Sequence, residues 1–219
     1  LDMIASGPAY PDASTAEQAL AIVKKYALHL SDEALSCLEA PTPNHLSNVE
    51  THITGSVRAL CAAAQDAAQK LGFQCRMLTD CLDCEAREAG RFLASIARSH
   101  QQTERPLAFF AGGETVVHLA GQGLGGRNQE LALAAAPGLR GTQNTAVCSF
   151  GSDGTDGPTD AAGGFVDQSS DAALRAAGLD VPQVLAENDA YHALQKIGGL
   201  LMTGPTGTNV NDLAMVLIW

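Results

Sequence analysis

Short apolar runs alternate with amphipathic segments along most of the chain. The apolar runs predict strands over residues 49–54, 73–79, 107–111, 115–119, 145–150, 200–203 and 214–218. Apolar residues at helical spacing predict helices over residues 14–26, 32–39, 55–70, 85–99, 128–136, 171–177 and 189–197. Strands that alternate with helices in this way predict an α/β fold, which we expect to be a layered α/β/α sandwich around a mixed, largely parallel sheet.

Local signals support several of these boundaries. Ser14 and Glu17 have the spacing of a capping box, which predicts the start of the first helix. Pro41 and Pro43 follow the second helix and end it, and Gly72 follows the third as a C-cap. The helices in the first third of the chain therefore have defined ends.

The chain is expected to have two parts. Residues 1–48 form a turn-rich and helical segment, and residues 49–219 form the α/β domain, with the polar run 99–105 as a candidate internal boundary. The sequence begins with Leu1 rather than with methionine, and residues 3–5 have the pattern of a strand end. We therefore expect the C-terminal part of a longer protein.

Composition narrows the class of partner. The chain has 219 residues, is 46% hydrophobic with a mean hydropathy of +0.02, and carries 24 acidic and 13 basic residues for a net charge of −11. This balance predicts a globular protein and argues against nucleic acid or an anionic membrane as the main partner. No apolar run has the length of a membrane span, and no signal peptide is visible. The protein could still bind a small anionic substrate, provided that an arginine, backbone N–H groups or a metal supply positive potential at the site.

The six cysteines lie mostly within apolar patterns and lack the spacing of a disulfide framework. They are Cys37, Cys61, Cys75, Cys81, Cys84 and Cys148. We interpret them as buried free thiols in a reducing compartment, which predicts a cytoplasmic protein. Cys81 and Cys84 form a lone C-x-x-C pair without a second pair nearby, so neither zinc nor a thioredoxin-like role is favoured.

Four glycine-rich polar loops in the second half of the chain carry the candidate chemistry. They cover residues 112–115, 121–130, 151–163 and 203–212. An open α/β sheet binds its ligands in loops that follow strands, whereas a solvated surface turn is the alternative for any one of them. The loop 151–163 follows a predicted strand and holds three carboxylates, Asp153, Asp156 and Asp160. Together with Glu114, Asp189 and Asp212 these carboxylates could hold Mg²⁺.

The loop 121–130 predicts an anion site at the start of a helix. Its glycines allow close approach of backbone N–H groups, and Arg127 brings a planar donor suited to phosphate or carboxylate. A surface salt bridge is the alternative role for Arg127, and helix capping is the alternative for Asn128. Asn188 and Asp189 are equally well explained as an N-cap.

A dinucleotide site is the competing interpretation of this loop. Gly121, Gly123 and Gly126 match the G-x-G-x-x-G fingerprint. The expected acidic residue at the end of the next strand is missing, because the first downstream carboxylate is Asp153 within a loop. We therefore discount NAD at this position.

Taken together, the motifs resemble a known family. Residues 112–115, 125–133, 153–163 and 203–212 are similar, in this order, to the MOFRL domain. That domain is the C-terminal domain of the two-domain glycerate 2-kinases, some of which have been labelled hydroxypyruvate reductases. Residues 4–12 resemble the last segment of the family's N-terminal domain, so the resemblance spans nearly the whole chain.

The resemblance implies ATP-dependent phosphorylation of D-glycerate to 2-phosphoglycerate with Mg²⁺, in a cleft between two α/β domains. It implies that Arg127 is the active-site arginine and that Asp153, Asp156 and Asp160 form the acidic loop, with Asp153 and Asp156 as the candidate metal ligands. The residues implied in substrate or phosphate binding are Gly112, Gly113, Glu114, Thr115, Gly125, Gly126, Asn128, Thr206, Thr208, Asn209 and Asn211. The family's first domain, with its active-site lysine, is not in this sequence, so this portion alone is expected to be inactive.

Two other functions stay open. One is a nicotinamide-dependent hydroxypyruvate reductase, and the other is a non-catalytic ligand-binding fragment. The expected partners are glycerate and a nucleotide, a homodimer is left open, and neither nucleic acid nor a membrane is expected. All of these site assignments require the glycine-rich loops to meet at a common edge of the sheet.

Overall fold

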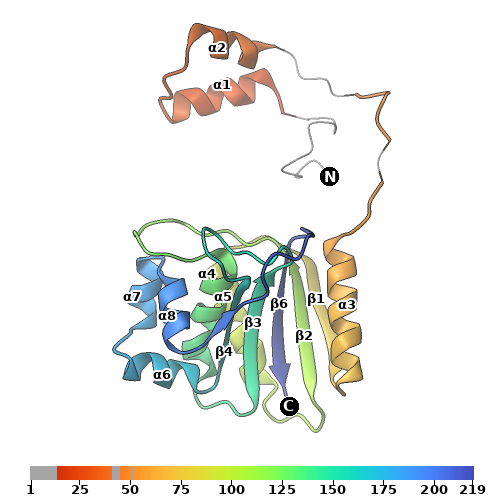
Figure 1. Cartoon of the computed structure of the whole chain (residues 1–219), viewed down its shortest axis with the longest axis vertical. Coiled ribbons are helices and arrows are strands. Elements are labelled where there is room, and N and C mark those ends of the chain that lie inside the picture. The colour runs from red at the N-terminus through yellow and green to blue at the C-terminus, as the bar shows by residue number, and fades with distance from the viewer. Residues whose placement is uncertain (1–13, 41–44, 51) are drawn as a thin grey trace. The chain divides into compact units, whose positions relative to one another are not determined.

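The computed structural model describes residues 14–40, 45–50 and 52–219. The chain forms two compact units, Leu1–Ile53 and Thr54–Trp219, which we describe separately (Figure 1). The predictions for residues 3–12 and for Pro41 and Pro43 lie outside the described residues.

The described part of the first unit holds two helices, α1 (Ala16–Lys25) and α2 (Asp32–Glu39). The capping box of α1 is formed by Thr15 and Gln18, one residue later than the predicted pair Ser14 and Glu17. The predicted bounds of α2 are confirmed. Neither helix has a buried residue among those described.

The second unit is built on a six-stranded sheet. Its strands are β1 (Gln74–Leu82), β2 (Leu107–Gly113), β3 (Thr145–Gly151), β4 (Gly163–Asp167), β5 (Leu200–Leu201) and β6 (Asp212–Ile218). Their order across the sheet is β1-β2-β6-β3-β4-β5. The last strand along the chain thus lies in the middle of the sheet, between β2 and β3 (Figure 1).

The sheet is mixed, as predicted, but its ladders are mostly antiparallel. β1 and β2 pair in parallel, and every other neighbouring pair is antiparallel. The strands β1, β2, β3 and β5 do run in the same direction, but the reversed strands β6 and β4 separate them. The prediction of a largely parallel sheet is therefore right for strand direction and wrong for pairing.

Helices cover both faces of the sheet and complete the predicted α/β/α sandwich (Figure 1). The helix α3 (Val57–Lys70) packs on one face. The opposite face carries α4 (Ala86–Ser99), α5 (Arg127–Ala135), the 3-10 turn η1 (Ala136–Leu139), α6 (Ser170–Ala176), α7 (Val181–Ala186) and α8 (Ala190–Lys196). Successive residues of a strand point to opposite faces, so Phe110 lies in the core under α3 and Phe109 in the core under α4 and α5.

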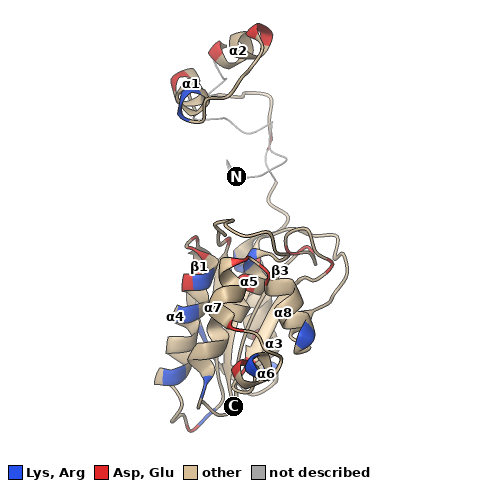
Figure 2. Ribbon diagram, turned by 90° about the vertical axis from the view of Figure 1, so that its left-hand side faces the viewer, with Lys and Arg blue, Asp and Glu red and all other residues tan. Residues whose placement is uncertain are grey.

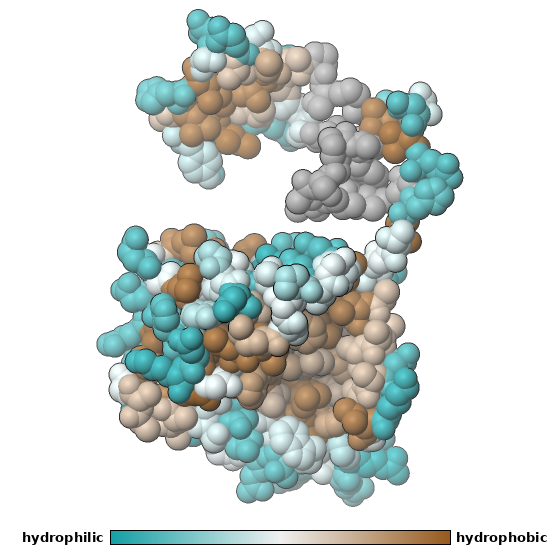
Figure 3. All heavy atoms as spheres, in the orientation of Figure 1, coloured by the Kyte–Doolittle hydropathy of each residue, from teal (hydrophilic) through white to brown (hydrophobic). Residues whose placement is uncertain are grey.

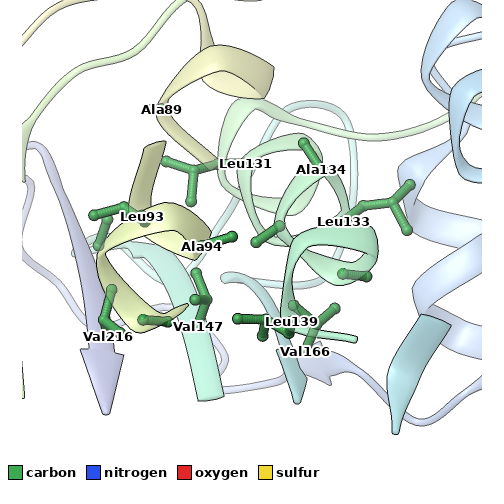
Figure 4. Close-up of a cluster of buried hydrophobic side chains, with 14 of the residues drawn as sticks. Ala89, Leu93, Ala94, Leu131, Leu133, Ala134, Leu139, Val147, Val166 and Val216 are labelled. Carbon is green, nitrogen blue, oxygen red and sulfur yellow. The ribbon is translucent and has the colours of Figure 1, made fainter. Parts of the chain in front are cut away.

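The larger core lies between the sheet and the pair α4 and α5 (Figure 4). Leu93, Leu131 and Val147 are buried there, and each such side chain contributes roughly 1.5–3 kcal/mol through loss of contact with water. The helices approach closely because Gly90 has no side chain; a Cβ at that position would lie 2.1 Å from the carbonyl oxygen of Leu131. This close packing holds α5, and therefore Arg127 at its start, in a fixed place over the sheet.

The opposite face of the sheet is more open. Phe150, Met215 and Leu217 pack beside the α3 core but stay half-buried. Figure 3 shows apolar surface over this face next to α3.

Of the helices in the described part of the chain, none has the length and apolar composition needed to cross a membrane.

Some predicted elements differ from those observed. The predicted strand 49–54 does not form at its described positions, and the predicted strand 115–119 makes only a single bridge between Val116 and Glu85. The strand β4 and the helix α7 were not predicted. A pair of glycines begins β4, and glycine is a poor strand residue. The helix α7 has only six residues, too few for a helical periodicity to be recognised in the sequence.

Candidate functional site

The glycine-rich loops meet at one edge of the sheet. β2 ends at Gly113 and β3 ends at Gly151, and both residues pair with Asp212 at the start of β6. β4 begins at this same edge, because Gly163 pairs with Phe150. The segments that join these strand ends therefore lie together above the sheet, as the site assignments required (Figure 1).

Arg127 is the first residue of α5 and reaches back to the sheet. Its Nε donates to Asp212 Oδ2 at 2.5 Å, its Nη2 donates to Asp212 Oδ1 at 3.1 Å, and its Nη1 lies 3.1 Å from Glu114 Oε1. The hydrogen bonds that Arg127 donates to the Asp212 carboxylate raise the pKa of Arg127 further above its usual range. A guanidinium has five N–H donors, so these three contacts leave others for a ligand.

Asp212 is the partner that fixes Arg127. It is 6% exposed and lies at the start of the central strand β6. The sequence placed Asp212 only among the carboxylates available for Mg²⁺. Its pairing with Arg127 joins residues 85 positions apart, which local patterns do not reveal.

Asp156 caps the start of α5 from a distance. Its Oδ1 accepts from the backbone N–H of Asn128 at 3.1 Å and from Asn128 Nδ2 at 3.2 Å, and its Oδ2 accepts from the backbone N–H of Gln129 at 2.8 Å. Burial raises the pKa of Asp156 to about 6, although these hydrogen bonds act in the opposite direction. The anion at this helix start is thus the protein's own carboxylate.

Gly126 makes room for this carboxylate. A Cβ at Gly126 would lie 2.3 Å from Asp156 Cγ, so only glycine permits the contact. Gly126 is also the N-cap residue of α5, so the alternative role of Asn128 as the cap is wrong. Asn128 lies within the helix and accepts a hydrogen bond of 2.5 Å from Ser149 Oγ.

A small cavity lies beneath this cluster. Its volume is about 10 Å³, close to the lower limit for one water molecule. Thr115, Asn128, Ser149 and Asp212 contribute polar side chains to its lining. Thr115 and Asn128 are both buried, so their expected contact with substrate stays a prediction.

The other two carboxylates of the acidic loop have different surroundings. Asp153 Oδ1 accepts from the backbone N–H of Thr155 at 2.9 Å. A Cβ at Gly151 would lie 3.1 Å from Asp153 Oδ1 and 3.5 Å from Asp212 Oδ1, so these two carboxylates flank Gly151. Asp160 is exposed and accepts a hydrogen bond of 2.7 Å from Tyr191 Oη. Asp153 thus lies beside Asp212, and Asp156, whose carboxylate interacts electrostatically with both Arg127 and Asp212, is the second member of the acidic loop near this pair.

The loop 203–212 is tied to the acidic loop. Thr206 Oγ1 donates to the carbonyl oxygen of Ser152 at 2.5 Å, and the backbone N–H of Thr206 donates to the carbonyl oxygen of Asp153 at 3.1 Å. Ser152 Oγ in turn accepts from the backbone N–H of Val210 at 2.8 Å. The four residues of this loop that are predicted to bind phosphate or substrate, Thr206, Thr208, Asn209 and Asn211, are all exposed.

The glycines predicted to bind substrate fall into two groups. Gly112 faces α3, where a Cβ would lie 2.5 Å from Cys61 Sγ, so it serves packing beneath the site. Gly113 precedes Glu114 at the end of β2, and Gly125 precedes Gly126 at the start of α5. The roles of these residues toward a ligand stay predictions.

The site has an excess of negative charge. Glu114 and Asp212 contact one guanidinium, Asp153 and Asp156 lie near Asp212, and Figure 2 shows acidic residues among the loops above α5 and β3. No group of three or more His, Cys, Asp or Glu side chains with the geometry of a metal site is found among the described residues. Because both oxygens of Asp156 are hydrogen-bonded, Asp153 is the better placed of the two candidate metal ligands.

The cysteines differ in burial. Among the six free thiols, Cys61 and Cys148 are buried, and burial raises the pKa of Cys148 to about 12. Cys37, Cys81 and Cys84 are exposed, so the prediction of buried thiols is wrong for these three. Apolar neighbours in the sequence did not distinguish a core position from a surface one.

Two family models match the chain. The MOFRL family matches residues 107–212, and a domain of unknown function (DUF4147) matches residues 1–39. The first match contains all four glycine-rich loops. The second covers α1 and α2 of the first unit.

Curated proteins and solved structures resemble the chain over its whole length. D-glycerate 2-kinase from Thermotoga maritima is 54% identical over 100% of this chain and 53% of its own length. A crystal structure of glycerate kinase from the same organism has a TM-score of 0.82, with 100% of this chain and 54% of that chain covered. Glycerate kinase from Macaca fascicularis is 32% identical over 100% of this chain and 69% of its own length.

A protein from Agrobacterium vitis named putative hydroxypyruvate reductase is 37% identical over 98% of this chain and 51% of its own length. The chain thus spans about half the length of most of these relatives.

Proposed function

The chain belongs to the glycerate kinase family, and we propose that it is the C-terminal portion of a glycerate 2-kinase that phosphorylates the 2-hydroxyl group of D-glycerate with ATP. The observation that carries the proposal is the fixed guanidinium of Arg127 at the loop edge of the sheet. Asp212 and Glu114 hold three of its five donors. The remaining donors suit a carboxylate or a phosphoryl group, the two anionic groups of this reaction.

Arg127 acts by alignment and by charge. Phosphoryl transfer requires the attacking and leaving oxygens in line, with the charge of the transferred group neutralised. A guanidinium that is already fixed by Asp212 needs no reorganisation when charge develops, so its effect on the transition state is larger than that of a mobile side chain. We assign Arg127 to the glycerate carboxylate or to the transferring phosphoryl group.

The acidic residues fit the Mg²⁺ that ATP requires. Proteins hold Mg²⁺ through one or two carboxylates together with waters and substrate phosphates, rather than through a complete cage. Asp153, which uses one oxygen in a contact to Thr155, and the half-exposed Glu114 have the oxygen donors for this role. When bound, the ion would neutralise charge on the phosphate oxygens. The exposed residues Thr208, Asn209 and Asn211 would line the anion.

The excess of carboxylates predicts that the active site needs residues from outside this sequence. An anionic substrate and a nucleotide require more positive charge than Arg127 alone supplies beside Glu114, Asp153 and Asp212. We therefore expect a cationic side chain outside this sequence to face the loop edge. This portion alone is expected to lack activity.

An ADP-release assay tests the proposal. The full-length protein that contains this chain should release ADP from ATP in proportion to added D-glycerate, and the product should be 2-phosphoglycerate by ³¹P NMR. This chain alone should release none above background. Absence of glycerate-dependent ADP release from the full-length protein would contradict the proposed function.

A reductase is less compatible with the start of α5. A dinucleotide fingerprint needs the N–H groups at the helix start for the pyrophosphate, and here Asp156 already occupies those of Asn128 and Gln129. We expect no saturable quenching of NADH fluorescence by the full-length protein. Tight quenching would favour the reductase instead.

A further inference from the structure

The turn between α7 and α8 is hydrogen-bonded to the glycine-rich segment 118–125, which precedes α5. The backbone N–H of Gly123 donates to the carbonyl oxygen of Glu187 at 2.8 Å, and the backbone N–H of Leu124 donates to Asp189 Oδ1 at 2.9 Å. A further contact joins the N–H of Tyr191 to the carbonyl oxygen of Leu124 at 2.9 Å. The segment is therefore held at several points by residues more than 60 positions away.

Asn188 is at the centre of this contact. Its Oδ1 accepts from the backbone N–H groups of Ala120 at 2.8 Å and Gly121 at 2.9 Å, and its Nδ2 lies 3.3 Å from the carbonyl oxygen of His118. The side chain is 6% exposed, so each of these hydrogen bonds is shielded from competing water. One side chain thus satisfies three backbone groups of a segment that has no regular secondary structure.

The first two glycines of the apparent dinucleotide fingerprint serve this contact. A Cβ at Gly121 would lie 2.3 Å from Glu187 Cα, and a Cβ at Gly123 would lie 2.4 Å from Asp189 Cβ. Any side chain at either position would push the segment away from the turn. The spacing that suggested a nucleotide site is thus explained by packing against residues 187–189.

A buried charge anchors Asn188 from below. Its Nδ2 donates to Glu130 Oε2 at 3.2 Å, and Arg87 Nε donates to Glu130 Oε1 at 3.0 Å. Glu130 is 2% exposed and lies on α5, one turn after Arg127. The acceptor Glu130 fixes the orientation of the Asn188 amide, because only its NH₂ group can donate to a carboxylate.

The segment held by Asn188 connects two residues of the candidate site. Glu114 precedes it and Arg127 follows it, and these two side chains are in contact at 3.1 Å. We propose that Asn188 is a positioning residue that holds segment 118–125 against the α7–α8 turn and thereby sets the place of Arg127 for the anion. This inference rests on the proposed kinase function, because its expected consequence is a change in the rate of the kinase reaction.

A variant can remove the side chain without disturbing the backbone. Asn188 has φ 54°, in the left-handed region that glycine adopts without strain. Asn188→Gly therefore removes the amide and keeps the turn. Glu187→Ala is the matched control on the same turn, because the Glu187 side chain is exposed and the carbonyl that binds Gly123 is retained.

Both variants are made in the full-length enzyme, alone and together with Arg127→Ala. We expect Asn188→Gly to lower kcat/KM for D-glycerate by about tenfold to a hundredfold, the range of a small misplacement of a site residue. If Asn188 acts through Arg127, the same change should have little further effect in the Arg127→Ala background, so the two losses are not additive. The kcat/KM of Glu187→Ala for D-glycerate should equal that of the unchanged enzyme.

Amide hydrogen exchange provides a readout that does not depend on activity. Faster exchange confined to residues 118–125 in Asn188→Gly, at a temperature where both proteins are fully folded, would support the contact and rule out general unfolding. If the unchanged enzyme is active, three results would each overturn the inference. They are normal exchange over residues 118–125 in Asn188→Gly, a normal kcat/KM of Asn188→Gly, and losses that are fully additive with those of Arg127→Ala. Lack of glycerate-dependent activity in the unchanged enzyme would instead reject the proposed function and this inference with it.

Discussion

Arg127 and Asp212 meet in a two-point contact, with Nε 2.5 Å from Oδ2 and Nη2 3.1 Å from Oδ1. The contact joins the first residue of α5 to the first residue of the central strand β6. It therefore links the helix layer to the sheet at the edge where the loops meet. Because two nitrogens of the guanidinium bind the two oxygens of the carboxylate, the contact fixes the orientation of the guanidinium plane as well as the position of its charge.

Substitution of Arg127 should reduce catalysis far more than stability. We expect Arg127→Ala in the full-length enzyme to lower kcat/KM for D-glycerate by about a hundredfold, comparable to loss of one preorganised donor. Arg127→Lys should recover little, because an ammonium cannot make the two-point contact with Asp212. Steady-state kinetics would measure both variants. The control is Arg175→Ala, which removes a mostly exposed arginine paired with Asp171; near-normal turnover of Arg127→Ala would exclude Arg127 from the site.

The buried carboxyl of Asp156 should make stability depend on pH. Its pKa is raised from 3.8 to about 6 by burial, so the folded state binds the proton more tightly than the unfolded state. The stabilising contribution is thus full below about pH 3.8 and is lost as the pH rises through about 6, a change of roughly 3 kcal/mol.

Urea unfolding of this chain and of Asp156→Asn between pH 4 and pH 7.5 measures this effect. The free energy of unfolding of the unchanged chain, relative to the variant, should fall as the pH rises. Taking the difference between the two free energies of unfolding removes the contribution of the other carboxyl groups, which both proteins share. A relative stability that rises with pH would mean that the three N–H contacts at the helix start outweigh burial.

Gly126 should tolerate no side chain. A Cβ there would lie 2.3 Å from Asp156 Cγ, so Gly126→Ala must displace the carboxylate that caps α5. We expect a loss of about 1–3 kcal/mol in the free energy of unfolding, as for other forced contacts in a packed interior. Gly125→Ala is the control, because its Cβ would lie 3.3 Å from the nearest atom, the backbone nitrogen of Ala190. Equal losses in the two variants would contradict the capping role of Asp156.

The thiols should react in order of exposure. Cys37, Cys81 and Cys84 are exposed, whereas Cys61 and Cys148 are buried and the pKa of Cys148 is about 12. Treatment with a chromogenic disulfide at pH 8 should modify the three exposed thiols first, since only the thiolate attacks. Mass spectrometry of the products identifies the modified positions. Early modification of Cys148 in the folded protein would contradict its place in the core strand β3.

Much of the α/β pattern could be predicted from the sequence because it repeats locally. Apolar periodicity placed α4, α5 and β3 to within one or two residues of their observed ends. β4 was missed because Gly163 and Gly164 are poor strand residues by propensity. They are required there by packing, since a Cβ at Gly164 would lie 2.5 Å from a side-chain atom of Leu194.

The candidate site could be predicted only at the level of loops. The composition of residues 151–163 indicated a polar loop after a strand, but not which carboxylate faces inward. Asp156 caps a helix 28 positions earlier and also interacts with Asp212, Asp160 contacts Tyr191, and Asp153 lies beside Asp212. Such divisions of labour depend on contacts between distant segments, which neither spacing nor composition encodes.

The central place of β6 has a consequence for how the protein is made. β1 and β2 on one side, and β3, β4 and β5 on the other, have no hydrogen-bonded ladder with each other until β6 enters between them. During synthesis both halves emerge from the ribosome before the strand that joins them, with open edges available for wrong pairing. We expect the nascent chain to depend on chaperones until residues 212–218 have emerged, and the Arg127 contact to form among the last.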